Sequence, residues 1–541
     1  MKIPVLIAGA GPVGLTLALD LAWRGVPSLL VEPLTEVHAH PRAISIGVRT
    51  MEHFRRLGLD QKVIDAGVPR SRALDVIYVT RMLGREIFRF PIPSIDELAR
   101  DAARLAVETP EITASPYYKT WTAQSPLERM LRAEVTRSPK IEPRYGWRLD
   151  SFVESEHGVT AILVELATGR REEVVAHYLV GNDGANSAVR AGLDTRMSGR
   201  GTLGEAVGLY FKAPTLGARL GTRPGVMYWA LASGCAGVIY TIDGGDEWVF
   251  NRYFAPGETA SAEEPVGLIQ RAIGEKLDIE ILSAQKWLPR QLVADRYQSA
   301  RCFLAGDACH LFVPTGGFGM NTGIGDAVDL SWKIAARLAG WGGATLLASY
   351  ETERRPIGLY NTREAADNYD KSGTIFAVPD ALEEDSAAGD AARRSVAALL
   401  PPKIKHFAPI GVHLGSAYEN SPLIVDDGTP PVAFDPVRYV PSARPGQRAP
   451  HAWLAPGKST LDLFGRGFTL LRFGGAAGGD ALIGAARAAE LPLTVADVAD
   501  AAAARLYERR LVLVRPDGHV AWRGESAPAE PRAIVDRVRG A

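Results

Sequence analysis

The chain has 541 residues, of which 46% are hydrophobic, so it is long enough for roughly two to four folded domains. Its 61 basic and 62 acidic residues give a net charge of −1, which offers no reason to expect a nucleic-acid or membrane-surface partner. Three cysteines and no CxxC pair predict neither a disulfide framework nor a zinc site, and they favour a reducing, cytoplasmic setting.

The N-terminal stretch IPVLIAGAGPVGLTLALDLAWRGVPSLLVEP predicts a buried strand over 3–8, a tight turn, a helix and a second strand that ends at Glu32. Gly9, Gly11 and Gly14 form G-x-G-x-x-G, which permits the turn, close approach of a pyrophosphate and tight packing of the helix. Glu32, the acid at the end of the second strand, is expected to form a hydrogen bond with a ribose. These features predict a dinucleotide site, although the loop alone does not separate NAD from FAD. Glycines and a proline interrupt the apolar run, so neither a signal peptide nor a membrane span is expected.

Two middle stretches, about 74–118 and 203–291, are rich in β-formers separated by turn residues. The runs VMYWALA, AGVIYTIDGG and EWVFNRYF predict an antiparallel sheet with many aromatic side chains. An aromatic-lined cavity suits an aromatic ligand, whereas any single aromatic can equally belong to the sheet core. Tyr228 and Tyr240 are the pocket candidates, and no residue stands out as a catalytic base.

The stretch FLAGDACHLFVPTGGFGMN, residues 303–321, predicts a strand that delivers an acid and then a glycine-rich turn. Asp307 at the end of this strand can accept hydrogen bonds from the hydroxyl groups of a ligand. Gly316, Gly317 and Gly319 permit positive φ and close backbone approach.

A helix over 322–338 is expected next, with Asn321 and Thr322 as good N-cap residues. Apolar positions alternate with charges, including Asp329 and Lys333, so an amphipathic helix is predicted. The N-terminus of this helix would carry partial positive charge.

His310 could act as a base, bind a metal or serve the structure. Only Cys309 is adjacent, and no spaced His or carboxylate cluster accompanies it, so no metal site is predicted. A structural role is the favoured interpretation, with Cys309 as a small buried residue.

The tail contains a helical connection over 371–440 and a separate domain over 441–541. FTLLRF predicts a strand, GDALIGAARAAEL a helix, RLVLVRPDGHVAWRG a hairpin and EPRAIVDRVRG a closing helix.

Three motifs in this order resemble the class A flavoprotein monooxygenases, the FAD-dependent aromatic hydroxylases that include para-hydroxybenzoate hydroxylase and phenol hydroxylase. The first is the glycine loop. The second is YLVGNDGANSAVR, which matches the D-G motif through Asp183, Gly184, Ser187 and Arg190. The third is the G-D motif, carried by Gly306 and Asp307 in the later stretch.

The resemblance implies an α/β fold with a Rossmann-like FAD-binding domain formed by 1–73, 119–202 and 292–370. A substrate-binding β-sheet domain, inserted as 74–118 and 203–291, would cover the flavin. The last domain, 441–541, resembles the thioredoxin-like C-terminal domain of the phenol hydroxylase branch, here without CxxC.

The resemblance also implies a set of cofactor-binding residues. Gln124 and Arg129 match positions near the FAD phosphates, and a capping box of Ser125 and Glu128 is the alternative interpretation of that segment. The full predicted set is Gly9, Gly11, Pro12, Gly14, Glu32, Arg42, Gln124, Asp183, Asp307, Pro314, Gly317, Gly319, Met320 and Asn321.

The activity implied is that of an FAD-dependent monooxygenase, which uses NADH or NADPH and O2 to hydroxylate a phenolic or other aromatic substrate through a flavin C4a-hydroperoxide. A Baeyer–Villiger or other oxygenation of a polyketide-type aromatic is the alternative on the same scaffold. A small aromatic substrate and O2 are the expected partners, and a homodimer is compatible with the sequence. A non-catalytic FAD sensor and a plain NAD dehydrogenase are the rivals of a different class.

Overall fold

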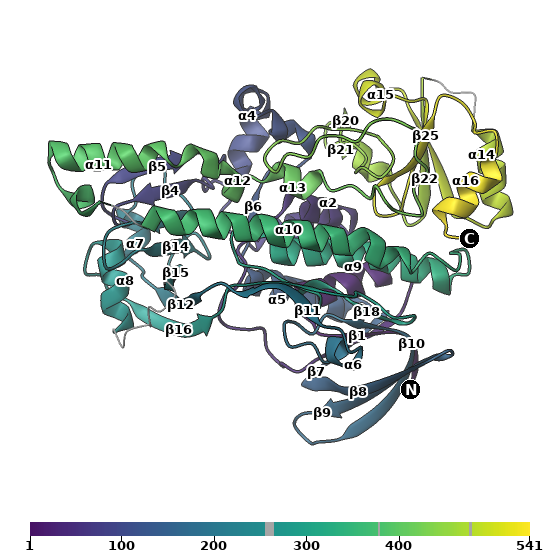
Figure 1. Cartoon of the computed structure of the whole chain (residues 1–541), viewed down its shortest axis with the longest axis horizontal. Helices are drawn as coiled ribbons and strands as arrows, with labels where there is room; N and C mark the ends of the chain where they lie inside the picture. Colours follow the sequence, from purple (N-terminus) through teal and green to yellow (C-terminus); the bar gives the residue numbers. More distant parts are fainter. Residues whose placement is uncertain (255–263, 377–378, 475–478) are drawn as a thin grey trace.

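The computed structural model describes residues 1–254, 264–376, 379–474 and 479–541. Figure 1 shows the C-terminal part of the chain at one end of the molecule and a β-sheet of the middle segment at the other. The long helix α10, Ser349–Gly373, crosses between them. The three cysteines are all free and buried. No helix of the described ranges is long and apolar enough to cross a membrane.

The N-terminal sheet confirms the Rossmann-like prediction. Within the described residues it has seven strands in the order β7-β2-β1-β10-β9-β8, with β18 paired to β10. The pairs of β1 with β2, β2 with β7, β1 with β10 and β10 with β18 are parallel, so their carboxyl ends meet at one edge. The strands are β1 Lys2–Ala8, β2 Ser28–Glu32, β7 Ile141–Tyr145, β8 Trp147–Ser155, β9 Gly158–Glu165, β10 Arg171–Gly181 and β18 Cys302–Leu304.

The helices of this part pack on that sheet. Helix α1 contacts both α5 and α9, and its apolar side chains join those of β1, β2 and β10 in the largest core. A two-stranded sheet, β3-β6, and a three-stranded sheet, β11-β17-β19, complete the first domain. The elements are α1 Pro12–Trp23, β3 Ser45–Ile46, α2 Val48–Arg56, α3 Asp60–Asp65, β6 Thr120–Trp121, α5 Gln124–Arg137, α6 Ala188–Gly192, β11 Met197–Thr202, β17 Arg290–Ala294, β19 His310–Leu311 and α9 Phe318–Leu338.

The middle segment forms a second sheet in the order β16-β12-β15-β14-β13-β4-β5. Its pairs are antiparallel, as predicted, except for the parallel pair of β13 with β4, which joins the two stretches of the segment. Part of the second stretch, 255–263, lies outside the described residues. The elements are β4 Val76–Val79, β5 Glu86–Phe90, α4 Ile95–Glu108, β12 Glu205–Lys212, α7 Leu216–Arg219, β13 Met227–Ala230, β14 Gly237–Thr241, β15 Glu247–Phe254, α8 Pro265–Ile273 and β16 Glu280–Trp287.

The segment expected to be a connection contributes to a core. Helices α11 Ala387–Ala398, α12 Ile404–Phe407 and α13 Ile410–Leu414 follow α10. Val396, Phe407 and Ile410 are buried in one cluster with residues of the middle sheet. This segment therefore packs against both neighbouring parts: α11 contacts β5 of the middle sheet, and α13 contacts α2 of the first domain.

The last part of the chain has the predicted strand, helix and hairpin. Its four-stranded sheet has the order β23-β22-β24-β25, with β22 and β23 parallel and the others antiparallel. The elements are β20 Trp453–Ala455, β21 Lys458–Ser459, β22 Phe468–Phe473, α14 Asp480–Ala488, β23 Leu493–Val498, α15 Ala501–Tyr507, β24 Leu511–Val514, β25 Val520–Gly524 and α16 Pro531–Val538.

Buried charges join this last sheet to the first domain. Lys333 Nζ on α9 lies 2.7 Å from Asp329 and 2.6 Å from Glu353 on α10. Arg515, in the turn between β24 and β25, contacts both carboxylates and Asp517. All five side chains are at most 2% exposed. The prediction that α9 is amphipathic was therefore wrong, because its charged face is buried against charged partners.

Candidate functional site

A cavity of about 650 Å³ lies between the N-terminal sheet and the middle sheet. The predicted cofactor residues that line it are Gly11, Pro12, Arg42, Gln124, Asp307, Pro314, Gly317, Gly319 and Met320. Gly9, Gly14, Glu32, Asp183 and Asn321 lie next to these segments but not in the lining. Residues from three distant parts of the sequence thus meet at one edge of the sheet.

The glycine loop follows β1 and opens α1. Gly9 has φ of +102°, and a Cβ there would lie 2.2 Å from the carbonyl oxygen of Asn182. A Cβ on Gly14 would lie 2.0 Å from the carbonyl oxygen of Gly9. A Cβ on Gly11 would meet nothing within 4 Å. The loop is therefore tightly packed at Gly9 and Gly14 and open at Gly11. The open position lies at the N-terminus of α1, where free N–H groups can bind a phosphate.

Glu32 ends β2 beside the loop. One carboxylate oxygen accepts from the N–H of Ala10 at 2.7 Å, and the other accepts from the N–H of Leu34 at 3.0 Å. Arg42 reaches the cavity from the next loop.

Helix α5 places Gln124 at the cavity but lacks the capping box considered from the sequence. Its N-cap is Ala123, without a side-chain hydrogen bond. The hydroxyl of Ser125 instead donates to the carbonyl of His38, and Glu128 accepts from Gln124 at 2.6 Å. The capping-box interpretation was wrong because the helix starts two residues earlier than Ser125 as cap would require. Arg129 is exposed and outside the lining.

Asp183 turns away from the cavity. Its carboxylate accepts from the hydroxyl of Ser187 and from the N–H groups of Ala188 and Val189, so it holds the start of α6. The neighbouring Asn182 lines the cavity instead, and its side-chain oxygen and nitrogen are shielded without a hydrogen-bond partner in the described ranges. An orphaned amide of this kind is typical of a site shaped for a polar ligand. Sequence reasoning missed Asn182, although it directly precedes the recognised acid.

Asp307 follows β18 and projects into the cavity, where its side chain is open to solvent. The surrounding protein still desolvates the group, and this raises the pKa of its carboxyl, while His310 and Arg42 act in the opposite direction. Arg190 of the second motif donates to the carbonyl of Ala308 at 2.9 Å, so the second and third motifs are in direct contact.

The N-terminus of α9 forms the adjoining wall. Gly316 and Gly317 have φ of +91° and +67°, and the helix begins at Phe318 with Gly317 as its N-cap. The predicted start at Thr322 was therefore late by one turn. Gly319 and Met320 line the cavity with the first turn of the helix, whose dipole favours negative charge there.

Asn321 links the third motif to the strand before α2 and does not cap the helix. Its side-chain oxygen accepts from the N–H of Gly47 at 2.7 Å. Its nitrogen donates to the carbonyls of Ser45 at 3.1 Å and Gly317 at 2.7 Å. The residue therefore ties the loop before α9 to the segment 45–47 at the start of α2.

The opposite wall comes from one face of the middle sheet. It presents Met227, Trp229, Val238, Tyr240 and Tyr253 to the cavity. Burial raises the pKa of the Tyr240 hydroxyl, to which Asn251 donates at 3.2 Å.

Tyr228, the other pocket candidate, was misplaced by the prediction. Alternation along β13 points it to the other face of the sheet, where it joins a separate apolar cluster. Its hydroxyl accepts from the N–H of Gly225 at 2.9 Å.

The donor set fits FAD. An open glycine loop at one helix N-terminus suits the pyrophosphate, and Asp307 suits the ribityl hydroxyls. The second helix N-terminus and the unpaired Asn182 amide provide further polar contacts for the rest of the cofactor.

Comparison with known proteins agrees with this donor set. Residues 2–365 match the family model described as FAD binding domain, and residues 442–541 match that of the aromatic-ring hydroxylase C-terminal domain. The protein is an FAD-dependent aromatic monooxygenase of this family.

Two curated relatives and one solved structure illustrate the family. A putative polyketide hydroxylase of Streptomyces halstedii is 33% identical, with 98% of this chain and 95% of the relative covered. The 4-methyl-5-nitrocatechol 5-monooxygenase of a Burkholderia species is 32% identical, with 100% and 97% covered. The rebeccamycin biosynthetic enzyme RebC with reduced flavin is 39% identical, with a TM-score of 0.91 and 100% and 99% covered.

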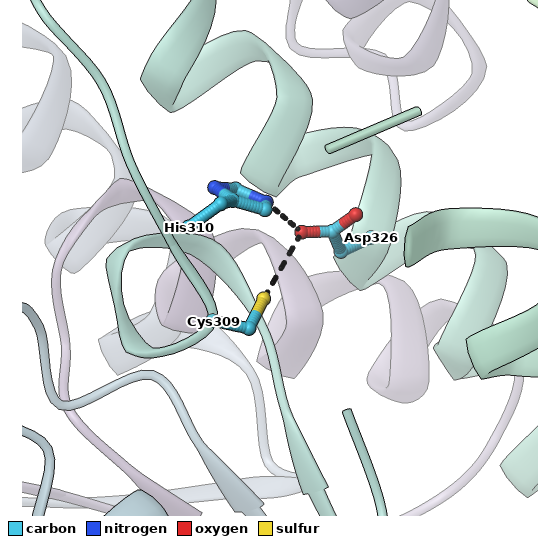
Figure 2. Close-up of side chains that lie close together, drawn as sticks. All are labelled: Cys309, His310 and Asp326. Atoms are coloured by element: carbon cyan, nitrogen blue, oxygen red, sulfur yellow. Dashed lines mark hydrogen bonds and ion pairs between the residues drawn. The ribbon is translucent and has the colours of Figure 1, made fainter. Parts of the chain in front are cut away.

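His310 of the monooxygenase is fully buried and does not line the cavity. Figure 2 shows it beside Cys309, with both side chains turned toward Asp326. His310 Nε2 is 2.7 Å from Asp326 Oδ2 on α9, and Cys309 Sγ is 4.0 Å from the same oxygen. The expectation that His310 has no carboxylate companion was therefore wrong, because α9 brings Asp326 back across the loop. The ligand atoms of these three residues lie within 4.8 Å of one another.

Asp326 already has partners for both oxygens. Arg354 Nε donates to Oδ1 at 2.8 Å, and the N–H of Gly306 donates to Oδ2 at 3.2 Å. Burial opposes the ionisation of this carboxyl, but His310 and Arg354 outweigh it and keep the pKa of Asp326 below its ordinary value. These contacts favour a structural role in the monooxygenase, in which Asp326 holds the loop that carries Asp307.

Proposed function

We propose that this monooxygenase uses NADH or NADPH and O2 to hydroxylate a phenolic ring held against the middle sheet. One observation carries the proposal: a single cavity has polar, cofactor-type residues on one wall and Met227, Trp229, Tyr240 and Tyr253 on the other. When bound, FAD supplies the electron transfer from the nicotinamide and the activation of O2.

The protein's own part is to bind, orient and keep out water. Gly11 and the N-terminus of α1 would bind the pyrophosphate, Glu32 the ribose and Asp307 the ribityl chain. The N-terminus of α9 would face the flavin ring with partial positive charge. The remaining predicted residues would shape these contacts: Gly9, Pro12, Gly14, Arg42, Gln124, Pro314, Gly317, Gly319, Met320 and Asn321. Asp183 would act indirectly, through α6 and Asn182.

The substrate we propose is an aromatic with more than one ring. A second cavity of about 450 Å³ adjoins the first and shares Trp229, Tyr253 and Thr315 with it, so a flat molecule could extend past the sheet. The name of one curated relative, a putative polyketide hydroxylase, supports a substrate with several rings. The name of the other, a nitrocatechol monooxygenase, supports a phenolic ring. Oxygen insertion into a ring of a polyketide-type aromatic is the second candidate.

The reductant, in this proposal, binds transiently at the surface near the D-G motif, because a second glycine loop is not evident in the sequence. We also propose the domain limits: 1–73, 119–202 and 292–370 for the FAD-binding domain, 74–118 and 203–291 for the substrate-binding domain, and 441–541 for the C-terminal domain. A homodimer is proposed as well. A cytoplasmic setting stays a prediction from cysteine usage.

The test uses the purified, FAD-loaded protein and a panel of phenols, naphthols and larger aromatic phenols. We expect oxidised-flavin absorbance, phenol-stimulated NADH or NADPH oxidation, and a product heavier by one oxygen atom. A ring-expanded lactone would favour the second candidate. Flavin absorbance without stimulation by any aromatic would contradict the proposed hydroxylation and favour a sensor.

A further inference from the structure

A small recess of about 80 Å³ opens off the main cavity, behind the loop that precedes α9. It shares Ile44, Ser45, Met227, Pro314, Gly317 and His406 with the lining of the main cavity. Its inner end is formed by Lys119, Trp121, Phe407 and His413. The recess is otherwise apolar, so the few polar groups in it decide what it can hold.

Lys119 is the charged group of this recess. Its Nζ donates to the carbonyl of Phe407 at 2.7 Å and lies 5.9 Å from the centre of the Trp121 ring. The side chain of Lys119 is half-buried, and no carboxylate of the described residues lies within 4.0 Å of its Nζ. The buried cations Lys333, Arg448 and Arg515, in contrast, each have a carboxylate partner. An ammonium group has three donors, and the carbonyl of Phe407 accounts for one of them, which leaves two for a ligand.

His406 faces the same space from the segment after α11. Its ring stacks on Phe407, with centroids 4.5 Å apart and planes at 9°, and meets Trp229 edge-on at 5.6 Å. Its Nδ1 is shielded from solvent and has no hydrogen-bond partner in the part of the chain that the structure describes. His406 lines both the recess and the main cavity, and the stacking holds its ring in place with one polar atom unpartnered.

The charge states of these groups follow from their surroundings. Burial, followed by the charges of Lys119, Lys403 and Lys405, lowers the pKa of His406 to about 3, and burial with Lys119 lowers that of His413 to about 4. Burial lowers the pKa of Lys119 to about 8. Near neutral pH the recess therefore holds one positive charge and two neutral imidazoles.

We propose that Lys119 and His406 bind the anionic oxygen of the substrate, so that the phenol is held as its phenolate beside the flavin loop. The phenol releases its proton to solvent as it binds, the phenolate oxygen takes the open donors of Lys119, and His406 Nδ1 contributes one hydrogen bond. This inference rests on the proposed hydroxylation of a phenolic ring. A phenolate is the electron-rich form of such a ring, so holding it would favour attack by an electrophilic oxygen.

The rival interpretation is that Lys119 only ties β6 to the segment around Phe407. A purely structural lysine would affect folding and cofactor retention, but it would not change the acidity of a bound phenol. The readout must therefore be the ionisation of the bound ligand.

The experiment uses the FAD-loaded full chain with 4-fluorophenol or 4-fluoro-1-naphthol, whose fluorine NMR shift reports ionisation. In the native protein we expect the pKa of the bound phenol to fall by roughly one unit or more, as expected for an opposite charge within a few ångströms. Lys119→Met should abolish this shift, and Lys119→Arg should retain most of it. Lys403→Met is the matched control, because Lys403 donates to the carbonyl of Lys371 outside the recess.

His406→Gln keeps a hydrogen-bonding group and should retain the shift better than His406→Leu. An unchanged phenol pKa in Lys119→Met, with native FAD content, would overturn the inference while leaving the proposed function intact. Failure of the native protein to hydroxylate any phenol would instead overturn the proposed function. If Lys119→Met does not fold, the comparison of Lys119→Arg with His406→Leu decides: equal shifts in these two variants and the native protein count against the inference.

Discussion

Arg515 Nη1, in the turn of the C-terminal hairpin, donates to Glu353 Oε1 on α10 at 2.6 Å, and both side chains are fully buried. With Asp329, Lys333 and Asp517 they form a cluster of three carboxylates and two cations. Burial and the neighbouring carboxylates raise the pKa of Asp329, which is what one surplus negative charge in a closed cluster would cause. Buried ion pairs thus hold the C-terminal domain against α9 and α10.

The first prediction concerns these buried ion pairs. Arg515→Met leaves Asp517 buried without its arginine and Glu353 with Lys333 as its only cation in the cluster, so the free energy of unfolding should fall by about 3–5 kcal/mol. Urea denaturation would measure the loss. Arg472→Met, which breaks an ion pair with Asp497 on the surface of the same domain, should cost less than about 1 kcal/mol. Equal costs for the two variants would contradict this role of Arg515.

The second prediction separates cofactor binding from packing in the glycine loop. Gly11 has φ of −71° and open space at its Cβ position, so Gly11→Ala should fold normally. Its methyl group would occupy room meant for the pyrophosphate, and FAD affinity should fall at least about tenfold, or 1.4 kcal/mol. Gly14→Ala would clash with the carbonyl of Gly9, so it should lower the melting temperature even without FAD. Fluorescence titration with FAD and thermal melts of the apoprotein distinguish the two effects.

The third prediction uses two neighbours on β13. Trp229→Leu removes a ring that lines the cavity and stacks on Tyr78 at 5.4 Å, so the Kd of an aromatic substrate should rise about tenfold while FAD content is unchanged. Tyr228→Phe faces the other side and should leave that Kd unaltered. It should cost about 1 kcal/mol of stability, because the N–H of Gly225 loses its acceptor. A weaker substrate affinity in Tyr228→Phe would contradict the assignment of the two faces.

The fourth prediction concerns acid stability. Burial opposes the ionisation of Glu52, but Arg448 and Arg49 outweigh it and lower its pKa from 4.5 to about 2. Because the pKa of Glu52 is lower in the folded state, its contribution to stability is fully present above about pH 4.5 and is lost as the pH falls toward 2. The shift corresponds to about 3 kcal/mol. Urea midpoints between pH 6 and 3 should therefore fall less steeply for Glu52→Gln than for the native protein, whereas the exposed Glu108→Gln should follow the native slope.

Those parts of the fold and site that rest on local backbone rules could be predicted from the sequence. G-x-G-x-x-G after an apolar run predicts a strand, a turn and a helix whatever surrounds them. Strands β1 and β2 lie within one residue of their predicted limits, and the predicted helix lies between them as α1. The hairpin from Leu511 to Gly524 follows in the same way from its Pro-Asp-Gly turn.

Features that depend on tertiary partners could not be predicted. Asp329 and Lys333 look like solvent-facing charges until Arg515 and Glu353 arrive from elsewhere in the chain. Asn182 has no local signal, because its role depends on the cavity in front of it. Lys119 and His406 are 287 positions apart and meet only in the folded chain.

The buried cluster around Arg515 also limits how this scaffold can be recombined. A chimaera that takes residues 442–541 from another member of the family would replace Arg515 and Asp517 while keeping Asp329, Lys333 and Glu353. Unless the donor domain supplies a matching arginine, the two buried carboxylates Asp329 and Glu353 would keep only Lys333 as a cation from this cluster. Exchange of substrate preference among these enzymes is therefore easier by grafting the middle sheet than by exchanging the C-terminal domain.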